Sequence, residues 1–454
     1  MVRPRFPDLD EETPDMSVEL DIDPLLILSE RIRTKEATVG VVGLGYVGLP
    51  LLVVVANAGF PVLGLEANPE KVEKLRDRRS YVVDVTDSDL ASVEDGEYST
   101  DPAILQRAEV IIICVPTPLT DHTPDLSLVR KAAHDVGLNL RPGRLVILES
   151  TTYPGTTEEL LRPILEETSG LSAGRDFALA YSPERIDPGQ SVHRLDNTPK
   201  IVAGLTDRCR DLATSFYSHF VREVVKTSSP REAEMAKLVE NTFRQVNIAL
   251  VNELAIMARE MDVNIWEALQ AASTKPFGYM PFWPGPGVGG HCISIDPSYL
   301  SWRAGQQLGY RISFIEHANE VNNRMPGYVV ARIGEALNDA GKAVRGSKVL
   351  AVGVAYKPGV DDLRESPSLA VMEKLASKGA DLSYHDPFVP ELHLGDRVLI
   401  SRPLTEEDVA QQDCVVLLTS HPGTDVRMLV RTAVLLFDSR GATVGMDSPN
   451  VVRL

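Results

Sequence analysis

Residues 38–57 read TVGVVGLGYVGLPLLVVVAN, and this stretch decides the fold of the N-terminal part of the chain. An apolar segment of strand length comes first, a glycine turn at residues 43–48 follows, and an apolar segment of helical length comes next. Gly43 permits a tight turn, Gly45 lets the backbone approach a pyrophosphate, and Gly48 lets helix and strand pack closely. A GxGxxG pattern in this context predicts a dinucleotide-binding unit whose phosphates face a helix N-terminus.

Glu66 ends the next strand candidate, PVLGLE, where such folds hold the adenosine ribose. A carboxylate there accepts hydrogen bonds from the ribose and repels the 2′-phosphate of NADP, so NAD is the expected cofactor. Lys71 could partly offset that repulsion, although a lysine at such a position is more often a solvated helix residue. Loops at the carboxyl ends of parallel strands line the ligand crevice, which adds Thr117 and Thr151. The expected cofactor contacts of this domain are Gly43, Gly45, Tyr46, Val47, Gly48, Glu66, Lys71 and Thr117.

Apolar segments of strand length alternate with helical stretches in two parts of the chain, after residue 37 and again after residue 347. Between them, residues 230–261 form one helical pattern that is apolar around much of its circumference, which predicts burial and a subunit interface. This alternation predicts an α/β protein with two Rossmann-like, doubly wound parallel-sheet domains, joined by a central helical domain with one long helix. The expected segments are an acidic N-terminal extension with one docked helix (1–35), a first sheet domain (36–228), a helical domain (229–327) and a second sheet domain (328–454).

The 454 residues carry a formal net charge of −18, which argues against general nucleic-acid binding because that activity needs a basic surface. No apolar run approaches the roughly 20 residues that span a bilayer, and the charged N-terminus lacks a signal-peptide core. We therefore expect a cytoplasmic enzyme that engages no membrane. The four cysteines are scattered without a Cys-x-x-Cys pair, so neither a metal site nor a disulfide framework is expected.

Cys292 differs from the other cysteines because it follows a loop rich in glycine, proline and aromatic residues, KPFGYMPFWPGPGVGGHC (residues 275–292). Glycines let a ligand or another backbone come close. A thiol in water is only roughly 3% thiolate at pH 7, and either Lys237 or a cluster of backbone N–H groups could favour the thiolate. A buried structural cysteine is the alternative, which the glycine-rich setting disfavours. We predict that Cys292 is a nucleophile.

Lys237, Asn241 and Arg244 share one face of the predicted long helix, because they are four and three residues apart. Solvent exposure would explain any one of them, but three in register among apolar neighbours suit a site better. We expect Lys237 and Asn241 to donate hydrogen bonds to an oxyanion on a tetrahedral carbon. Asp296 is expected to cap the next helix and also to orient or deprotonate water. His291 is left out because adjacent side chains diverge.

Long motifs in the right order resemble the UDP-glucose/GDP-mannose dehydrogenase family, and more narrowly its UDP-N-acetylhexosamine 6-dehydrogenase branch. The resemblance runs from about residue 37 to the C-terminus. It implies an NAD domain, a central helical domain that dimerises and carries catalytic residues, and a C-terminal nucleotide-sugar domain. The motifs are GLGYVGLPL (43–51), ESTTYPGTT (149–157), YSPERIDPG (181–189), KLVENTFRQVNIALVNELA (237–255), PFGYMPFWPGPGVGGHCISIDP (276–297) and GVAYKPGVDDLRESP (353–367).

The resemblance also implies a four-electron oxidation of the sugar C6 alcohol of a UDP- or dTDP-hexose, by a homodimer or higher homo-oligomer. Cys292 would capture the aldehyde as a thiohemiacetal, which is oxidised to a thioester and then hydrolysed to the uronic acid. Arg364 maps to a cofactor contact from the C-terminal domain, and Lys357 to a substrate contact. The implied catalytic set is Cys292, Lys237, Asn241, Asp296, Glu184 and Thr151. The expected substrate contacts are Arg185, Arg244, Tyr279, Trp283, Gly289 and Lys357.

Several positions depart from the family pattern and leave the sugar open. Pro188 stands where the glucose enzymes carry a second glutamate, whose role is dropped or passes to another residue such as Glu149. His291 in place of serine, and Trp283 near the position of a lysine, favour an N-acetylhexosamine. Ser294 departs from the proline expected in that branch, so UDP-glucose or dTDP-glucose remains an alternative.

Two other functions also remain as rival hypotheses. An ordinary two-electron dehydrogenase of the hydroxyacid type would use Lys237 and Asn241, but it would need neither the cysteine loop nor the second nucleotide-fold domain. A non-catalytic NAD- or nucleotide-sugar-binding regulator would not need the intact catalytic set.

Overall fold

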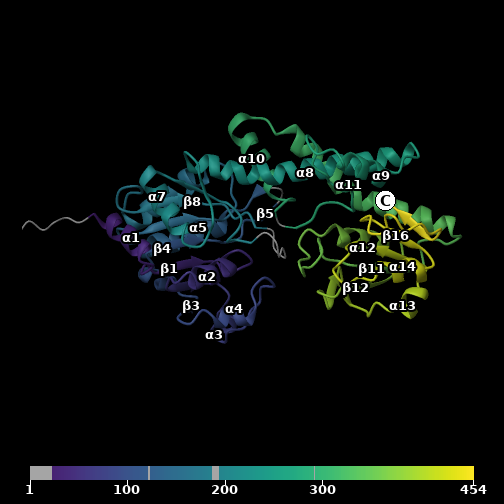
Figure 1. Ribbon diagram of the computed structural model, residues 1–454, viewed down its shortest axis with the longest axis horizontal. Coiled ribbons are helices and arrows are strands. Elements are labelled where there is room, and N and C mark those ends of the chain that lie inside the picture. The colour runs from purple at the N-terminus through teal and green to yellow at the C-terminus, as the bar shows by residue number, and fades with distance from the viewer. Residues whose placement is uncertain (1–22, 121–122, 187–193, 291) are drawn as a thin grey trace, which may run out of the picture.

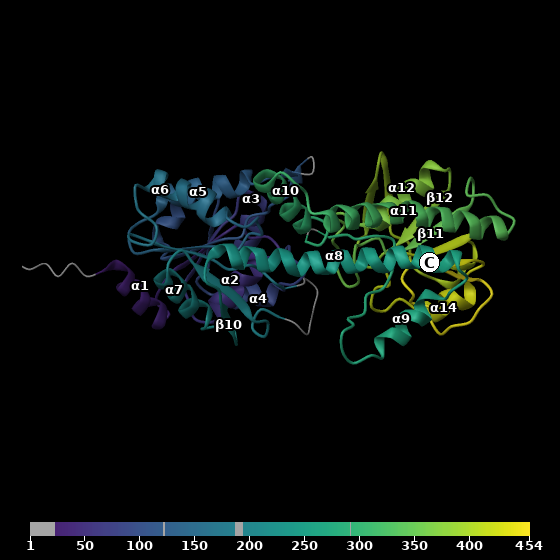
Figure 2. The same ribbon diagram turned by 90° about the horizontal axis from the view of Figure 1, so that it is seen from above.

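The computed structural model describes residues 23–120, 123–186, 194–290 and 292–454. Two α/β bodies lie at opposite ends of an elongated molecule, and the helix α8 (Pro230–Glu260) runs from one to the other (Figures 1 and 2). The sequence prediction of two sheet domains joined by a helical region is confirmed.

The first sheet has eight strands in the order β10-β9-β8-β7-β4-β1-β2-β3. All neighbours run parallel except β8 and β9, which pair antiparallel. The order reverses between β1 and β4, and ligands of doubly wound sheets bind outside the carboxyl ends of the strands at such a point. The strands are β1 (Val39–Val42), β2 (Val62–Leu65), β3 (Glu97–Ser99), β4 (Val110–Ile113), β7 (Leu145–Leu148), β8 (Ala178–Tyr181), β9 (Lys200–Gly204) and β10 (Val224–Lys226).

Every residue of β1, β2, β4, β7, β8 and β9 is buried, as expected for a sheet with both faces covered. These six strands are apolar segments of strand length in the sequence, whereas β3 and β10 are three residues each and too short to show a pattern. The accompanying elements are α2 (Gly48–Asn57), α3 (Pro69–Arg76), α4 (Asp87–Ala91), η1 (Pro102–Arg107), the hairpin β5 (Leu119–Thr120) and β6 (Thr123–Pro124), α5 (Ser127–Asn139), η2 (Thr157–Leu161), α6 (Arg162–Ser169) and α7 (Asp207–Tyr217).

The described part of the N-terminal extension is the helix α1 (Pro24–Arg33), which packs on α7 and buries Leu25, Leu28 and Ile32. Asp23 caps this helix and pairs with Arg208 at 2.5 Å. The docked helix of the sequence prediction is therefore present, while residues 1–22 lie outside the described residues.

The central region consists of α8, α9 (Ile265–Ser273), α10 (Asp296–Leu308) and α11 (Ser313–Asp339). The N-terminal half of α8 packs on β8, β9 and α10, and its C-terminal half packs along α11. A single helix of 31 residues thereby connects the two sheet domains.

The second sheet has five parallel strands in the order β12-β11-β15-β16-β17, and its order reverses between β11 and β15. The C-terminal elements are β11 (Lys348–Val352), α12 (Pro367–Ser377), β12 (Asp381–His385), the hairpin β13 (Glu391–Leu394) and β14 (Arg397–Ile400), α13 (Glu406–Ala410), β15 (Cys414–Leu417), α14 (Val426–Thr432), β16 (Leu436–Asp438) and β17 (Val451–Arg453).

Candidate active site

A pocket of about 350 Å³ lies where the first sheet domain, α8, the glycine-rich loop and the C-terminal domain meet. It brings together nine residues that the sequence singled out, from segments up to about 180 positions apart. The predicted residues that line it are Arg185, Lys237, Asn241, Arg244, Trp283, Gly289 and Cys292, together with Lys357 and Arg364 of the C-terminal domain.

Cys292 lines this pocket and is exposed, in contrast to the three other cysteines, which are buried. Its loop lies directly against the C-terminal domain, because the Gly290 N–H donates to the Arg364 carbonyl at 3.0 Å. A Cβ atom at Gly289 would lie 2.7 Å from the Glu365 carbonyl oxygen, so only glycine permits this approach. The glycines before Cys292 therefore let two backbones meet and hold the thiol at the pocket surface.

Asp296 lies behind Asn241, whose amide donates to the Asp296 carboxylate at 2.5 Å. Burial raises the pKa of Asp296 to about 6, although the Lys237 charge and the Asn241 hydrogen bond both lower it. The expectation that Asp296 caps this helix was wrong. Ile295 is the cap residue, and Asp296 is the first residue of α10. Its carboxylate accepts from Asn241 of α8 and does not cap α10.

Glu184 belongs to a buried charge cluster next to the pocket. Its carboxylate accepts from the N–H groups of Arg185 at 2.7 Å and Ile186 at 2.6 Å, and Lys200 donates to it at 3.2 Å. Lys200 also donates to Glu149 at 3.1 Å. Burial works against ionisation, but the Lys200 charge and these donors hold the pKa of Glu184 below its usual value.

Glu149 is fully buried, and burial raises its pKa above the usual value in spite of Lys200. Tyr217 donates a hydrogen bond to its other oxygen. Glu149 is not among the residues that line the pocket, so its transfer of a second carboxylate's role stays a prediction. Sequence reasoning missed Lys200 because a lysine at the start of an apolar strand looks like a solvated flanking residue.

The glycine turn has the geometry expected for a dinucleotide. A Cβ at Gly48 would lie 1.9 Å from the Gly43 carbonyl oxygen, while a Cβ at Gly45 would meet no described atom within 4 Å. Gly48 therefore serves packing, and the space over Gly45 fits a pyrophosphate. Glu66 accepts from the N–H of Leu44 and of Asn68, both at 3.1 Å, and so holds the turn in place.

Arg364 links the glycine turn to the cysteine loop. Its guanidinium lies 5.1 Å from the ring centre of Tyr46 and pairs with Asp362 at 2.7 Å. The Asp362 hydrogen bond is the main cause that raises the pKa of Arg364, and the nearby Cys292 adds to it. Arg364 is thus a cation near the thiol, and the role of Lys237 or of backbone N–H groups in favouring the thiolate stays a prediction.

Three comparisons with known proteins agree with this geometry. The sequence models of the UDP-glucose/GDP-mannose dehydrogenase family match residues 37–221 (NAD binding domain), 231–324 (central domain) and 350–444 (UDP binding domain). The chain belongs to this family. Its members are NAD-dependent nucleotide-sugar dehydrogenases, and the cysteine thiohemiacetal mechanism is general to them.

Individual relatives cover most of this dehydrogenase. The UDP-N-acetyl-D-glucosamine 6-dehydrogenase of Pseudomonas aeruginosa is 39% identical over 357 residues, which is 78% of this chain and 84% of that protein. The solved UDP-D-ManNAc dehydrogenase of Pyrococcus horikoshii is 32% identical with a TM-score of 0.82, covering 92% of this chain and 98% of that one. A UDP-glucose dehydrogenase of Pyrobaculum islandicum is 28% identical with a TM-score of 0.78, covering 89% and 94%.

Other predicted residues of this dehydrogenase lie away from the pocket lining. Thr151 and Tyr279 are not among the residues that line it, and Lys71 lies 5.0 Å from the ring centre of Tyr81. Thr117 is buried, and its carbonyl accepts from the Tyr299 hydroxyl at 2.8 Å. Pro188 and His291 lie outside the described residues.

The structure adds pocket residues that sequence reasoning did not name, among them Glu240, Asp362 and Arg440. Arg440 follows β16, and burial lowers its pKa to about 10. Its place at the carboxyl end of a parallel strand is the signal that could have pointed to it. Within the described residues, no helix is long and apolar enough to cross a membrane, and no cluster of side chains could hold a metal ion.

Proposed function

We propose that this chain oxidises the C6 alcohol of a UDP-N-acetylhexosamine to a carboxylate, in two NAD-dependent steps through a thioester on Cys292. The observation that carries the proposal is an exposed thiol in a pocket shared by the NAD domain, α8 and the UDP binding domain. A two-electron dehydrogenase needs no such thiol. A protein that only binds its ligands needs no buried carboxylate such as that of Asp296, which is bound to Asn241 of the pocket.

The residues of the glycine turn fit NAD. The backbone at Gly45 would receive the pyrophosphate at the start of α2, while Gly43 and Gly48 permit the tight turn and its packing. Glu66 would lie on the ribose side, and Arg364 would reach the cofactor from the C-terminal domain. NAD, when bound there, supplies the hydride acceptor for each oxidation.

The chain's own residues account for capture of the aldehyde and for release of the acid. The Cys292 sulfur adds to the aldehyde carbon and the carbonyl oxygen becomes an oxyanion, which Lys237 and Asn241 stabilise by donating hydrogen bonds. The resulting carbon bears both sulfur and hydrogen, so a second hydride can leave and a thioester remains. Asp296 then takes a proton from water, the hydroxide adds to the thioester carbon, and the Cys292 sulfur leaves as thiolate. Glu184 supplies a fixed negative charge next to Lys237.

The nucleotide end of the substrate would lie toward Lys357, and the sugar toward Arg185, Arg244 and Trp283. The printed names of the relatives favour UDP-N-acetylglucosamine or UDP-N-acetylmannosamine. UDP-glucose and dTDP-glucose remain the competing substrates, since a UDP-glucose dehydrogenase shares the fold over most of both chains.

NADH formation with these four nucleotide sugars tests the proposal. We expect a UDP-N-acetylhexosamine to give the highest kcat/KM and two NADH per sugar consumed. A preference for UDP-glucose or dTDP-glucose would overturn the sugar assignment alone, whereas one NADH with a stable aldehyde product would overturn the four-electron mechanism.

We further propose a homodimer formed along α8. Five large apolar side chains on this helix are exposed in the monomer: Met235, Val239, Phe243, Leu250 and Met257. Monomeric proteins rarely leave so continuous an apolar face in water. The proposed domain limits are 36–228, 229–327 and 328–454, and the proposed location is the cytoplasm, where NAD and nucleotide sugars are available as substrates.

A further inference from the structure

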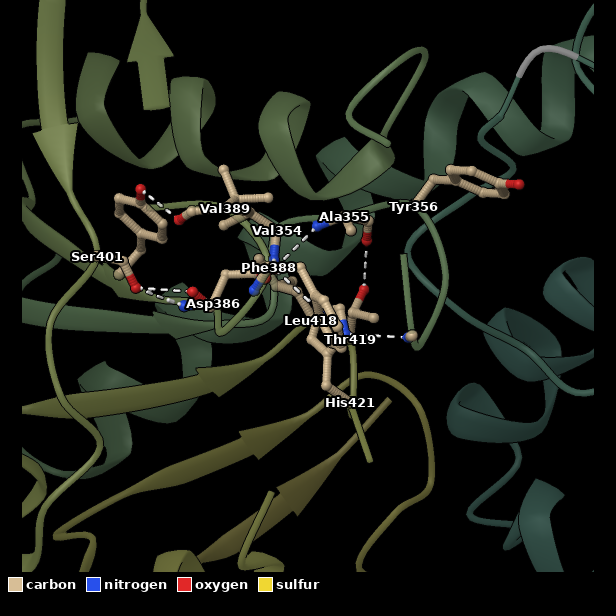
Figure 3. A network of polar contacts seen from close by, with 12 residues as sticks. Val354, Ala355, Tyr356, Asp386, Phe388, Val389, Ser401, Leu418, Thr419 and His421 are labelled. Carbon is tan, nitrogen blue, oxygen red and sulfur yellow. Dashed lines mark hydrogen bonds and ion pairs between the residues drawn. The ribbon is translucent and has the colours of Figure 1, made fainter. Parts of the chain in front are cut away.

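Three loops of the C-terminal domain meet at the point where its strand order reverses, between β11 and β15. Residues 353–366 follow β11, Asp386 follows β12, and His421 comes shortly after β15. Figure 3 shows that the Asp386 and His421 side chains point toward the beginning of the first loop. That loop carries Tyr356 and Lys357 into the main pocket.

Asp386 binds the start of this loop. One of its carboxylate oxygens accepts from the N–H of Val354 at 2.8 Å, from the N–H of Ala355 at 3.2 Å and from Nε2 of His421 at 2.9 Å. The other oxygen accepts from the Phe388 N–H at 2.9 Å. Burial opposes ionisation, but the His421 hydrogen bond and the backbone donors lower the pKa of Asp386, so its charge persists inside the domain.

His421 binds the far end of the same turn. Its Nδ1 accepts from the Gly359 N–H at 3.1 Å, which requires a lone pair on Nδ1 and therefore places the ring hydrogen on Nε2. Nε2–H then donates to Asp386, so both ring nitrogens are satisfied in one tautomer. The His421 side chain is only 1% exposed, and the Phe388 ring lies against it with 5.0 Å between ring centres.

The two residues thus hold residues 354 to 359 at both ends, with Lys357 between them. Thr419 adds a hydrogen bond to the Ala355 carbonyl at 2.7 Å, the Tyr356 N–H donates to the Asp362 carbonyl at 3.1 Å, and His421 is the side chain that binds the Gly359 N–H. A long lysine side chain keeps its direction only if its backbone is fixed, and a fixed binding group loses less entropy when a ligand binds.

We propose that the His421–Asp386 pair is a positioning unit that fixes Lys357 in the pocket and so sets the affinity for the nucleoside-diphosphate end of the substrate. The inference rests on the proposed function, in which this domain receives that end. His421 is not a catalytic residue, because it does not line the pocket and both its ring nitrogens have protein partners.

Three substitutions separate the two hydrogen bonds of His421. His421→Asn keeps an acceptor near the position of Nδ1, His421→Gln keeps a donor near Nε2, and His421→Phe keeps only an apolar ring. His393→Asn, on the exposed hairpin of the same domain, is the control. Binding of UDP and of NAD is measured by calorimetry, and KM and kcat are measured with the best nucleotide sugar.

We expect His421→Phe and His421→Gln to raise the Kd for UDP and the KM for the nucleotide sugar about tenfold, since a lost hydrogen bond and a loosened lysine each cost a several-fold change. NAD affinity and kcat should change less than about twofold, and His421→Asn and the control should stay within about threefold of the wild type.

UDP affinity unchanged in both His421→Phe and His421→Gln would overturn the inference and leave the proposed function intact. Equal losses in UDP binding, NAD binding and kcat would also overturn it, because they would indicate a structural role alone. If His421→Phe does not fold, equal UDP affinities of the Asn and Gln variants would be decisive against it. A wild-type chain that binds no UDP and reduces no NAD contradicts the proposed function itself.

Discussion

The pH dependence of turnover follows from the environment of Asp296. Its pKa is about 6, raised chiefly by burial, and the proposed base must be ionised to take a proton from water. About 90% of the carboxylate is then ionised at pH 7 and about 10% at pH 5, so kcat should fall about tenfold between these values when thioester hydrolysis is limiting. The activity is present above the pKa and is lost as the pH falls through it.

Substitution of Asn241 should raise the pH at which kcat falls, which is the acid limb of the pH profile. Asn241 donates to Asp296 at 2.5 Å and lowers its pKa. A hydrogen bond to a charged group contributes about 1.5–3 kcal/mol, and one pKa unit corresponds to about 1.4 kcal/mol. In Asn241→Ala the midpoint of the acid limb should therefore rise by about one to two pH units, in addition to any loss of kcat.

Steady-state NADH formation in buffers from pH 5 to 9 measures these profiles, and the chain's folded fraction is followed at each pH by circular dichroism. Asp296→Asn should show a burst of two NADH per active site followed by very slow turnover. A wild-type profile that is flat between pH 5 and 8, or an acid limb that persists in Asp296→Asn, would refute this account of the base.

Gly48→Ala should lower the melting temperature, because the methyl group would lie 1.9 Å from a backbone oxygen, whereas Gly45→Ala should fold normally and lose NAD affinity; calorimetry and thermal melts distinguish the two. Equal effects on stability would contradict the assignment of roles in the glycine turn. Lys200→Met should reduce the free energy of unfolding, measured in urea, by about 3 kcal/mol, because it leaves two buried carboxylates without their cation. Lys200→Arg keeps the positive charge and should retain most of the wild-type stability. Leu250→Glu should convert the dimer to a monomer in light scattering, and a wild-type monomer would contradict the proposed interface.

Local patterns predicted the parts of the fold that depend on neighbours in sequence. The buried strands of the first sheet are continuous apolar runs, and the glycine turn marks the start of α2. Lys237 and Asn241 could be placed on one face of α8 because helical spacing alone brings them together. The glycines before Cys292 predicted a close approach of a ligand or another backbone, and Gly289 does meet the backbone of Glu365.

Contacts between distant segments could not be predicted in the same way. Lys200 joins carboxylates that precede it by 51 and 16 residues, and His421 binds an N–H group 62 residues away. The sequence around Lys200 and around His421 contains no pattern that indicates these partners. The capping role expected for Asp296 was wrong for the same reason, because Asn241 of another helix binds its carboxylate.

The central claim is that one sulfur atom carries the sugar as a thioester. Asp296→Asn is mixed with excess NAD and a nucleotide sugar, quenched in acid and analysed by peptide mass spectrometry. The account predicts that the peptide containing Cys292 gains the mass of the nucleotide sugar less four hydrogens, with two NADH released per site. An unmodified Cys292 peptide after the same NADH release would contradict it.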